Sequence, residues 1–232
     1  MPAAEKIVGV IGGMGPEATV EFLRKIVAAT PAQDDADHVR ILVDNNPKIP
    51  SRIAALIDGN GPDPVPVLCA MAQGLEKQGA DFLTVPCNTA HHYLPAIASA
   101  VAIPVLDMVQ MSVAKLANLP SRPRKIGILA SPAVRSVGLY ASRLEAAGLE
   151  AFFPETEHET VLLDVIRGVK AGKDSNALQQ SYAAVASSLL DSDALLIACT
   201  ELSVLGIPTG VTQPCIDALD VLVEATIQNA KA

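Results

Sequence analysis

The sequence contains no tryptophan, and aromatic residues make up only 3% of its 232 residues. Half of the sequence is apolar, so a core must be packed mainly by aliphatic side chains. This length is sufficient for one large domain or two small ones. Clustered positive charge is also absent, because 25 Asp and Glu outnumber 17 Lys and Arg and the net charge is −8. Phosphate binding needs such clusters, so we expect no nucleic-acid partner.

Long apolar runs are missing as well. No stretch reaches the ~20 apolar residues that a membrane-spanning helix needs, so we expect no membrane partner. Residues Met1–Lys6 lead directly into an apolar strand, without the basic and apolar regions of a secretory signal peptide. The sequence therefore predicts a cytoplasmic protein. Its four cysteines show no Cys-x-x-Cys spacing. We expect reduced thiols and no metal.

Short β-branched runs alternate with stretches of helical periodicity, which is typical of parallel sheets in α/β proteins. The run Lys6–Ile11 is the first such strand. After a Pro- and Arg-containing linker at 120–124, the run Lys125–Ala130 repeats its pattern, and the chain begins again. We therefore predict two similar parallel-sheet αβα domains, related by a pseudo-two-fold axis, with the active site in the cleft between them.

The linker and the repeat set the expected domain bounds. Residues 1–118 should form the N-terminal α/β domain and residues 119–210 the C-terminal α/β domain. The last segment, 211–232, should pack back on the first domain. Within the second domain, a long helical region from about 159 to 190 should break near Gly172.

A glycine-rich turn, Gly12–Gly15, follows the first strand, and Pro16 suits the first turn of the next helix. It matches the dinucleotide-binding fingerprint only loosely, and such turns are common without a nucleotide. A polar loop follows the second strand and contains two cations, Lys48 and Arg52. Arg52 is the better candidate for an anion site, because its fork matches carboxylate geometry. Lys48 is expected to be a solvated surface charge.

Cys87 directly follows an apolar run that ends at Pro86. This order places a thiol at the carboxyl end of a buried strand, where open α/β sheets bind ligands. Asn88 and Thr89 stand at the expected N-cap of the next helix, where backbone N–H groups can hold an anion. The alternative is that Cys87 is simply a small buried apolar residue.

A second stretch has the same order, with an apolar run followed by Cys199, Thr200 and Glu201. Two cysteines at matching strand ends are harder to explain as buried packing residues than Cys87 alone would be. Asp107 and Asp217 follow them at similar spacings, either as helix N-caps or as part of the site. Two thiols that face each other can remove a proton from one face of a carbon and return one to the other, because cysteine serves as acid and base.

Four motifs resemble those of the cofactor-independent aspartate/glutamate racemase superfamily, and most closely its aspartate-racemase branch. The motifs are Ile11-Gly12-Gly13-Met14-Gly15-Pro16, Asn46-Pro47-Lys48-Ile49-Pro50-Ser51-Arg52, Pro86-Cys87-Asn88-Thr89-Ala90-His91 and Ala198-Cys199-Thr200-Glu201-Leu202. They occur in that branch's order and span almost the whole chain. The glutamate-racemase branch has an Asp-Ser-Gly turn where this chain has Gly-Gly-Met.

The resemblance implies two α/β domains, a homodimer, an amino-acid substrate, and neither pyridoxal phosphate nor metal. It implies Cys87 and Cys199 as the catalytic acid/base pair, with Arg52 and Lys170 each binding a substrate carboxylate. The other residues implied to line the site are Met14, Asn88, Thr89, Thr200 and Glu201. Some members carry a tyrosine four residues before the lysine, whereas Ile166 stands there in this chain. This difference weakens the expectation of strict specificity for aspartate. The presence of both cysteines favours racemisation in both directions.

These observations favour an amino-acid racemase, with aspartate as the leading substrate. A glutamate or broad-specificity racemase is the nearest alternative. A cysteine-dependent lyase or hydrolase of the same superfamily would instead use His91 or His92 as a base. A small-molecule binding module shares the architecture but does not need paired thiols.

Overall fold

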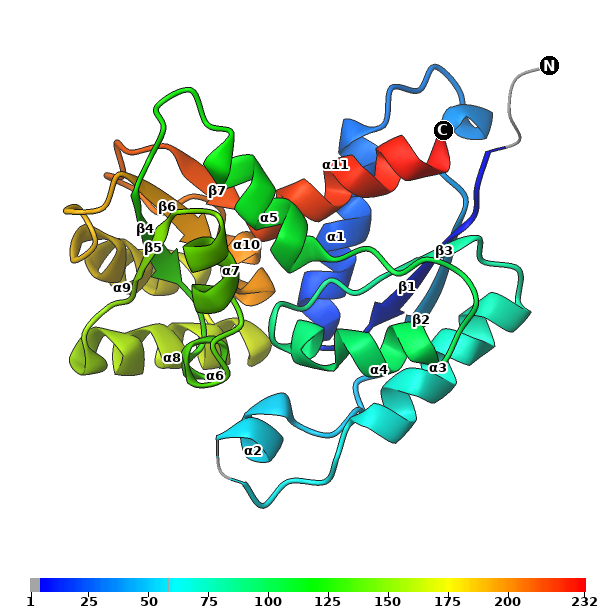
Figure 1. Cartoon of the computed structure of the whole chain (residues 1–232), viewed down its shortest axis with the longest axis horizontal. Helices are drawn as coiled ribbons and strands as arrows, with labels where there is room; N and C mark the ends of the chain where they lie inside the picture. Colours follow the sequence, from blue (N-terminus) through cyan, green and yellow to red (C-terminus); the bar gives the residue numbers. More distant parts are fainter. Residues whose placement is uncertain (1–4, 58) are drawn as a thin grey trace. The chain divides into compact units, whose positions relative to one another are not determined.

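The computed structural model describes residues 5–57 and 59–232 and divides into two compact units (Figure 1). The first unit runs to Met108 and includes Leu219–Ala232, and the second comprises Val109–Ala218. Residues 1–4, which belong to the stretch without signal-peptide features, lie outside the described residues. None of the described helices is long and apolar enough to cross a bilayer.

The first unit contains a parallel sheet of β1 (Val8–Gly12), β2 (Ile41–Asn45) and β3 (Phe82–Thr84), in the order β2-β1-β3. A single parallel bridge from Leu83 to Val105 extends the pairing beyond β3. Strands β1 and β3 are entirely buried, as parallel strands covered on both faces are expected to be.

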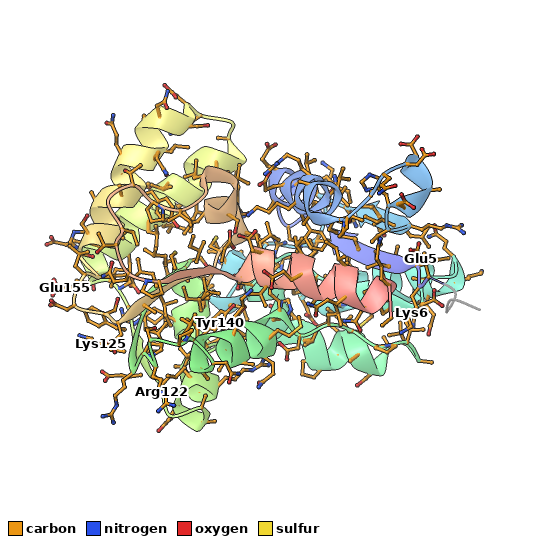
Figure 2. The ribbon with its side chains drawn as sticks, turned by 90° about the horizontal axis from the view of Figure 1, so that it is seen from above. Glu5, Lys6, Arg122, Lys125, Tyr140 and Glu155 are labelled. Atoms are coloured by element: carbon orange, nitrogen blue, oxygen red, sulfur yellow. The ribbon has the colours of Figure 1, made fainter. Side chains whose placement is uncertain are left out.

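Helices that follow these strands complete the first unit. They are α1 (Pro16–Ala29), η1 (Asp35–Asp37), α2 (Arg52–Leu56), α3 (Val65–Lys77), η2 (Thr89–Tyr93), α4 (Leu94–Ser99) and α11 (Ala218–Ala230). Helix α3 contacts all three strands. The end of α11 is bound to the start of the chain, because the Lys6 N–H donates to the carbonyl of Ala230 at 2.9 Å. Figure 2 shows Lys6 beside this helix end.

The second unit contains a parallel sheet of β4 (Lys125–Leu129), β5 (Glu150–Phe152), β6 (Ala194–Ile197) and β7 (Cys215–Asp217), in the order β5-β4-β6-β7. The Nζ of Lys125, labelled in Figure 2, lies 3.7 Å from the ring centre of Phe152 on the neighbouring strand. The predicted α/β class with parallel sheets is therefore confirmed in both halves of the chain.

Six helices accompany the second sheet in the described chain. They are α5 (Met108–Ala117), α6 (Pro132–Ser136), α7 (Ala141–Ala146), α8 (Thr156–Lys170), α9 (Ser175–Ser187) and α10 (Thr200–Leu205). Helices α8 and α9 pack side by side, and the chain turns between them at Gly172, which has φ +64°. The break predicted near Gly172 is thus confirmed. The two helices also pack closely at Gly168, where a Cβ would lie 2.5 Å from the Leu178 side chain.

The unit bounds differ from the expected 1–118, 119–210 and 211–232 at both junctions. Helix α5 falls almost wholly in the second unit. Strand β7 also belongs there, because it pairs with β6 and Leu195 donates its N–H to the carbonyl of Pro214 at 2.9 Å. Only Leu219–Ala232 of the last segment belongs to the first unit. Residues 211–218 belong to the second unit.

The internal repeat is visible in matching contacts of the two sheets. In the first, Gly9 of β1 lies opposite Leu83 of β3, and a Cβ on Gly9 would lie 2.6 Å from the leucine side chain. In the second, Gly127 of β4 lies opposite Leu195 of β6, and the corresponding distance is 2.5 Å. Both leucines precede a cysteine of interest by four residues. The same glycine–leucine contact therefore packs both cysteine-bearing strands.

The glycine-rich turn after β1 packs against the loop that follows β2. Gly13 has φ +94°, and a Cβ on it would lie 2.3 Å from the carbonyl oxygen of Asn46. The Gly13 N–H donates to the Thr19 hydroxyl at 2.9 Å, and that hydroxyl donates to the Gly15 carbonyl at 3.1 Å. The turn thus needs glycine at position 13 because the backbone of the loop after β2 lies against it.

We predict that Gly13→Ala destabilises the first unit more than Gly79→Ala. Gly79 has φ +96°, but a Cβ there would meet nothing within 4 Å. Gly79→Ala should cost about 1–2 kcal/mol for the left-handed conformation alone. Gly13→Ala should cost a further ~1–3 kcal/mol, because the backbone of Asn46 must move. Urea unfolding of both variants tests this, and equal losses would show that the turn is not tightly packed.

Candidate active site

Cys87 lies just beyond the end of β3, in the core of the first unit. It is 7% exposed and belongs to the same buried cluster as Met14, which is 2% exposed. Its N–H donates to the Val85 carbonyl at 2.8 Å, so the chain turns sharply after the strand. The structure therefore brings two of the predicted site residues, Cys87 and Met14, into one cluster.

Thr89 begins η2, a 3₁₀-helix rather than the longer helix that the pattern indicated, and Asn88 directly precedes it. Asn88 is buried and occupies the predicted N-cap position, while Thr89 is half-buried. The side chain of Asn88 makes no capping hydrogen bond, because its backbone is already helical at φ −57° and ψ −53°. The capping part of the prediction is therefore wrong, although the position itself is correct.

Arg52 is the first residue of α2 and is half-buried. Its Nη1 donates to the carbonyl of Pro50 at 2.9 Å and lies 3.4 Å from that of Ile49. Ser51 caps the helix by accepting from the Ala54 N–H at 3.3 Å. The loop thus holds the guanidinium through Nη1. Lys48 is exposed, as expected for a surface charge.

Tyr93 is a residue of this region that the motif comparison did not single out. It is 9% exposed and belongs to the cluster that contains Cys87. Burial raises the pKa of its phenol, the charge of Asp63 adds to this, and Arg52 opposes it. Tyr93 therefore belongs to the buried surroundings of Cys87. In the sequence, the signal that could have identified Tyr93 as part of this region was its position directly after His91 and His92.

The sequence places His91 and His92 shortly after Cys87, and the ring nitrogens of His91 bond to backbone groups. His91 is 2% exposed, and its Nδ1 lies 2.9 Å from the backbone carbonyl oxygen of Cys87. Its Nε2 accepts from the N–H of Met108 at 3.1 Å. His92 is exposed and packs edge to face on Tyr93, with 5.0 Å between ring centres. Both ring nitrogens of His91 are thus engaged by backbone groups.

Cys199 stands at the N-terminus of α10, two residues after β6. It is 7% exposed, and its thiol donates to Oε2 of Glu201 at 3.1 Å. The other carboxylate oxygen, Oε1, lies 3.1 Å from Nζ of Lys170 at the end of α8. Three predicted site residues therefore form a continuous chain of polar contacts.

The charges in this chain determine the protonation of Cys199. Burial is the largest cause that raises the pKa of its thiol well above the ordinary value. The negative charge of Glu201 and the thiol's hydrogen bond to it raise the pKa further, while Lys170 opposes them. A buried thiolate beside a carboxylate is unfavourable, so Cys199 rests as a thiol near neutral pH.

Two buried hydroxyls near Cys199 have no hydrogen-bond partner among the described residues. One belongs to Thr200, which is 1% exposed, and the other to Tyr182 of α9, which is fully buried. Asp217 at the end of β7 accepts from Ser203 at 2.7 Å, which ties that strand to α10. Ile166 is 2% exposed within the second core, so it packs inward.

The predicted residues form two groups, each within one unit. The first group is Met14, Arg52, Cys87, Asn88 and Thr89, and the second is Lys170, Cys199, Thr200 and Glu201. That the two cysteines oppose each other remains a prediction. Among the described residues, no group of three or more His, Cys, Asp or Glu side chains could hold a metal ion.

Comparison with known proteins places this two-unit α/β chain in a family. A family model described as Asp/Glu/hydantoin racemase matches residues 11–226. The chain therefore belongs to the Asp/Glu/hydantoin racemase family, and racemases are isomerases. The resemblance seen in the four motifs is confirmed.

Individual relatives cover nearly the whole chain. The broad-specificity amino-acid racemase RacX of Bacillus subtilis (strain 168) is 26% identical over 227 residues, covering 95% of this chain and 96% of RacX. The structure of Picrophilus torridus aspartate racemase has a TM-score of 0.88 at 32% identity, covering 97% of this chain and 94% of that one. Glutamate racemase from Francisella tularensis, in complex with D-glutamate, shares the fold, with a TM-score of 0.65 at 18% identity over 97% of this chain and 80% of its own.

The polar chain around Cys199 predicts opposite effects of two substitutions. Glu201→Gln removes the carboxylate that disfavours the thiolate, so the pKa of Cys199 should fall. Lys170→Met removes the opposing positive charge, so the pKa should rise. The pH dependence of iodoacetamide alkylation, followed for each cysteine peptide by mass spectrometry, measures both shifts. At pH 8, Cys199 should react severalfold faster in Glu201→Gln than in the parent. Shifts in the same direction in both variants would contradict the assigned contacts.

Proposed function

We propose that the chain is a cofactor-independent amino-acid racemase that moves protons through Cys87 and Cys199. The observation that carries this proposal is the equivalent position of the two cysteines. Each is 7% exposed and follows the strand that pairs with the central strand of its sheet, β3 beside β1 and β6 beside β4. Packing alone does not require a thiol at both equivalent positions.

The proposed reaction balances one proton lost against one gained. A thiolate on one face takes the α-proton of the bound amino acid, which forms an S–H bond and leaves an electron pair on the α-carbon and carboxylate. The thiol on the other face then delivers its proton to that carbon. The centre is inverted, and the thiol and thiolate have exchanged roles. Hydrogen bonds must stabilise the carbanion, because the α-proton is weakly acidic. Arg52, Asn88, Thr89 and Thr200 supply the donors in this proposal.

The contacts of Cys199 support its proposed role as the acid at the start of one direction. Its bond to Glu201 and its burial keep it protonated, so it acts first as the acid. Cys87 is then the base in that direction, and reversal of the reaction exchanges the roles. Lys170 lies beside that carboxylate, with 3.1 Å between its Nζ and Oε1 of Glu201.

Aspartate is the leading substrate, supported by the likeness to the Picrophilus torridus aspartate racemase. Arg52 would bind the α-carboxylate and Lys170 the side-chain carboxylate. The pairing of Lys170 with Glu201 reduces the positive charge offered to a second carboxylate. Glutamate and neutral amino acids are therefore the alternatives, and RacX, with its printed broad specificity, supports the latter. We further propose a cytoplasmic homodimer that works without pyridoxal phosphate.

The contacts of His91 disfavour the alternative of a cysteine-dependent lyase or hydrolase with a histidine base. A base needs a free nitrogen within reach of the thiol, and His91 spends both nitrogens on backbone groups. A binding module would not catalyse exchange of an amino-acid α-proton. Assay of D/L interconversion for aspartate, glutamate and neutral amino acids, with protein free of pyridoxal phosphate, tests the proposal.

We predict that the rate of racemisation falls about 10²–10⁴-fold in both Cys87→Ser and Cys199→Ser, because the hydroxyl of serine is much harder to ionise than a thiol. Each variant should retain α-proton exchange with one enantiomer only, and the two should prefer opposite enantiomers. Exchange in D₂O followed by NMR measures this. The control is Cys69→Ser, since the Cys69 thiol bonds only weakly to the Ala96 carbonyl at 3.6 Å. Near-parental racemisation by either catalytic variant would contradict the mechanism, as would the same preference in both.

A further inference from the structure

We propose that His91 is a positioning residue, which fixes the peptide group after Cys87 by bonding it to the start of α5. This inference rests on the proposed function, because it concerns the placement of the Cys87 thiol and the neighbouring amide. This role differs from that of a base, since both ring nitrogens of His91 bond to backbone groups.

The hydrogen bonds of His91 fix its tautomer. The Met108 N–H can only donate, so Nε2, which lies 3.1 Å away, must carry a lone pair. The carbonyl oxygen of Cys87 can only accept, so Nδ1, at 2.9 Å, must carry the proton. The ring is therefore neutral with its proton on Nδ1. A protonated ring could not accept from Met108, and it would place a charge on a residue that is only 2% exposed.

The bond to Cys87 orients more than one atom. A peptide group is planar, so fixing the Cys87 carbonyl also fixes the direction of the Asn88 N–H on the same plane. That amide is one of the groups proposed to hold an anionic substrate. The local chain does not secure this geometry by itself, because η2 is a five-residue 3₁₀-helix with weaker internal bonding than an α-helix.

The bond to Met108 secures the other end of the clamp. Met108 is the first residue of α5, and the first amides of a helix have no partner within the helix. Nε2 of His91 satisfies this one. The partial positive charge at a helix N-terminus also favours a neutral imidazole over a charged one. Two nitrogens of one buried ring thus join the Cys87 peptide to the beginning of a helix.

Two substitutions separate the two bonds. In His91→Asn, the amide nitrogen can take the place of Nδ1 and keep the bond to Cys87, while the bond to Met108 is lost. In His91→Gln, the longer side chain can place its oxygen where Nε2 was, which keeps the bond to Met108 and loses the one to Cys87. A general packing role would make the two variants similar.

The first measurement needs no substrate. Iodoacetamide alkylation is followed separately for Cys87 and Cys199 by mass spectrometry of the cysteine peptides. We expect Cys87 to react severalfold faster in His91→Gln than in His91→Asn, because its chain segment is released from the clamp. Cys199 belongs to the other unit and should react at the parental rate in both variants. Equal Cys87 rates in the two variants, or a parallel change at Cys199, would overturn the proposal.

The second measurement connects the clamp to catalysis. We expect kcat for racemisation to fall about 10- to 100-fold in His91→Gln, as misplacement of a reacting group does, with a smaller change in KM. His91→Asn should stay within a few-fold of the parent. If the chain racemises no amino acid, the proposed function fails while the alkylation test still decides the clamp. If racemisation is present but both variants lose kcat equally, the clamp is wrong and the proposed function stands.

Discussion

The contact between a glycine of the central strand and a leucine of its neighbour underlies both halves of the molecule. Gly9 with Leu83, and Gly127 with Leu195, bring adjacent parallel strands together where any larger side chain would collide. Because all strands in each sheet are parallel, their carboxyl ends lie along one edge. Four residues after each leucine, the chain reaches that edge with a cysteine. The strand packing therefore determines where Cys87 and Cys199 are presented.

The two thiols occupy equivalent positions but have different surroundings. Cys199 bonds to a buried carboxylate, which is itself paired with Lys170, whereas the Cys87 peptide is bonded by a neutral histidine. The carboxylate beside Cys199 opposes ionisation of that thiol. The imidazole near Cys87 bonds to a backbone carbonyl instead, so it does not oppose ionisation of the Cys87 thiol in this way. This asymmetry suits a reaction in which one cysteine begins as acid and the other as base. Burial of both strengthens such differences, because charges interact more strongly away from water.

Much of this arrangement could be predicted from the sequence. The β-branched runs predicted parallel strands such as β1 and β4, and the strand–cysteine order identified both candidate thiols. The break at Gly172 was visible because glycine tolerates its positive φ. The place of β7 was not predicted, since pairing with β6 depends on contacts remote in sequence. Likewise, no local pattern showed that Lys170 pairs with Glu201, or that His91 reaches Met108 across seventeen residues.

The fate of the α-proton tests the central claim, transfer by two thiols, most directly. L-aspartate, and in parallel D-aspartate, would be racemised in D₂O to a few per cent conversion, with the deuterium content of substrate and product read by NMR. Two bases predict that the newly formed enantiomer carries solvent deuterium while the recovered substrate keeps its protium. Deuterium in the recovered substrate at early conversion, or protium retained in the product, would show that a single group both removes and returns the proton.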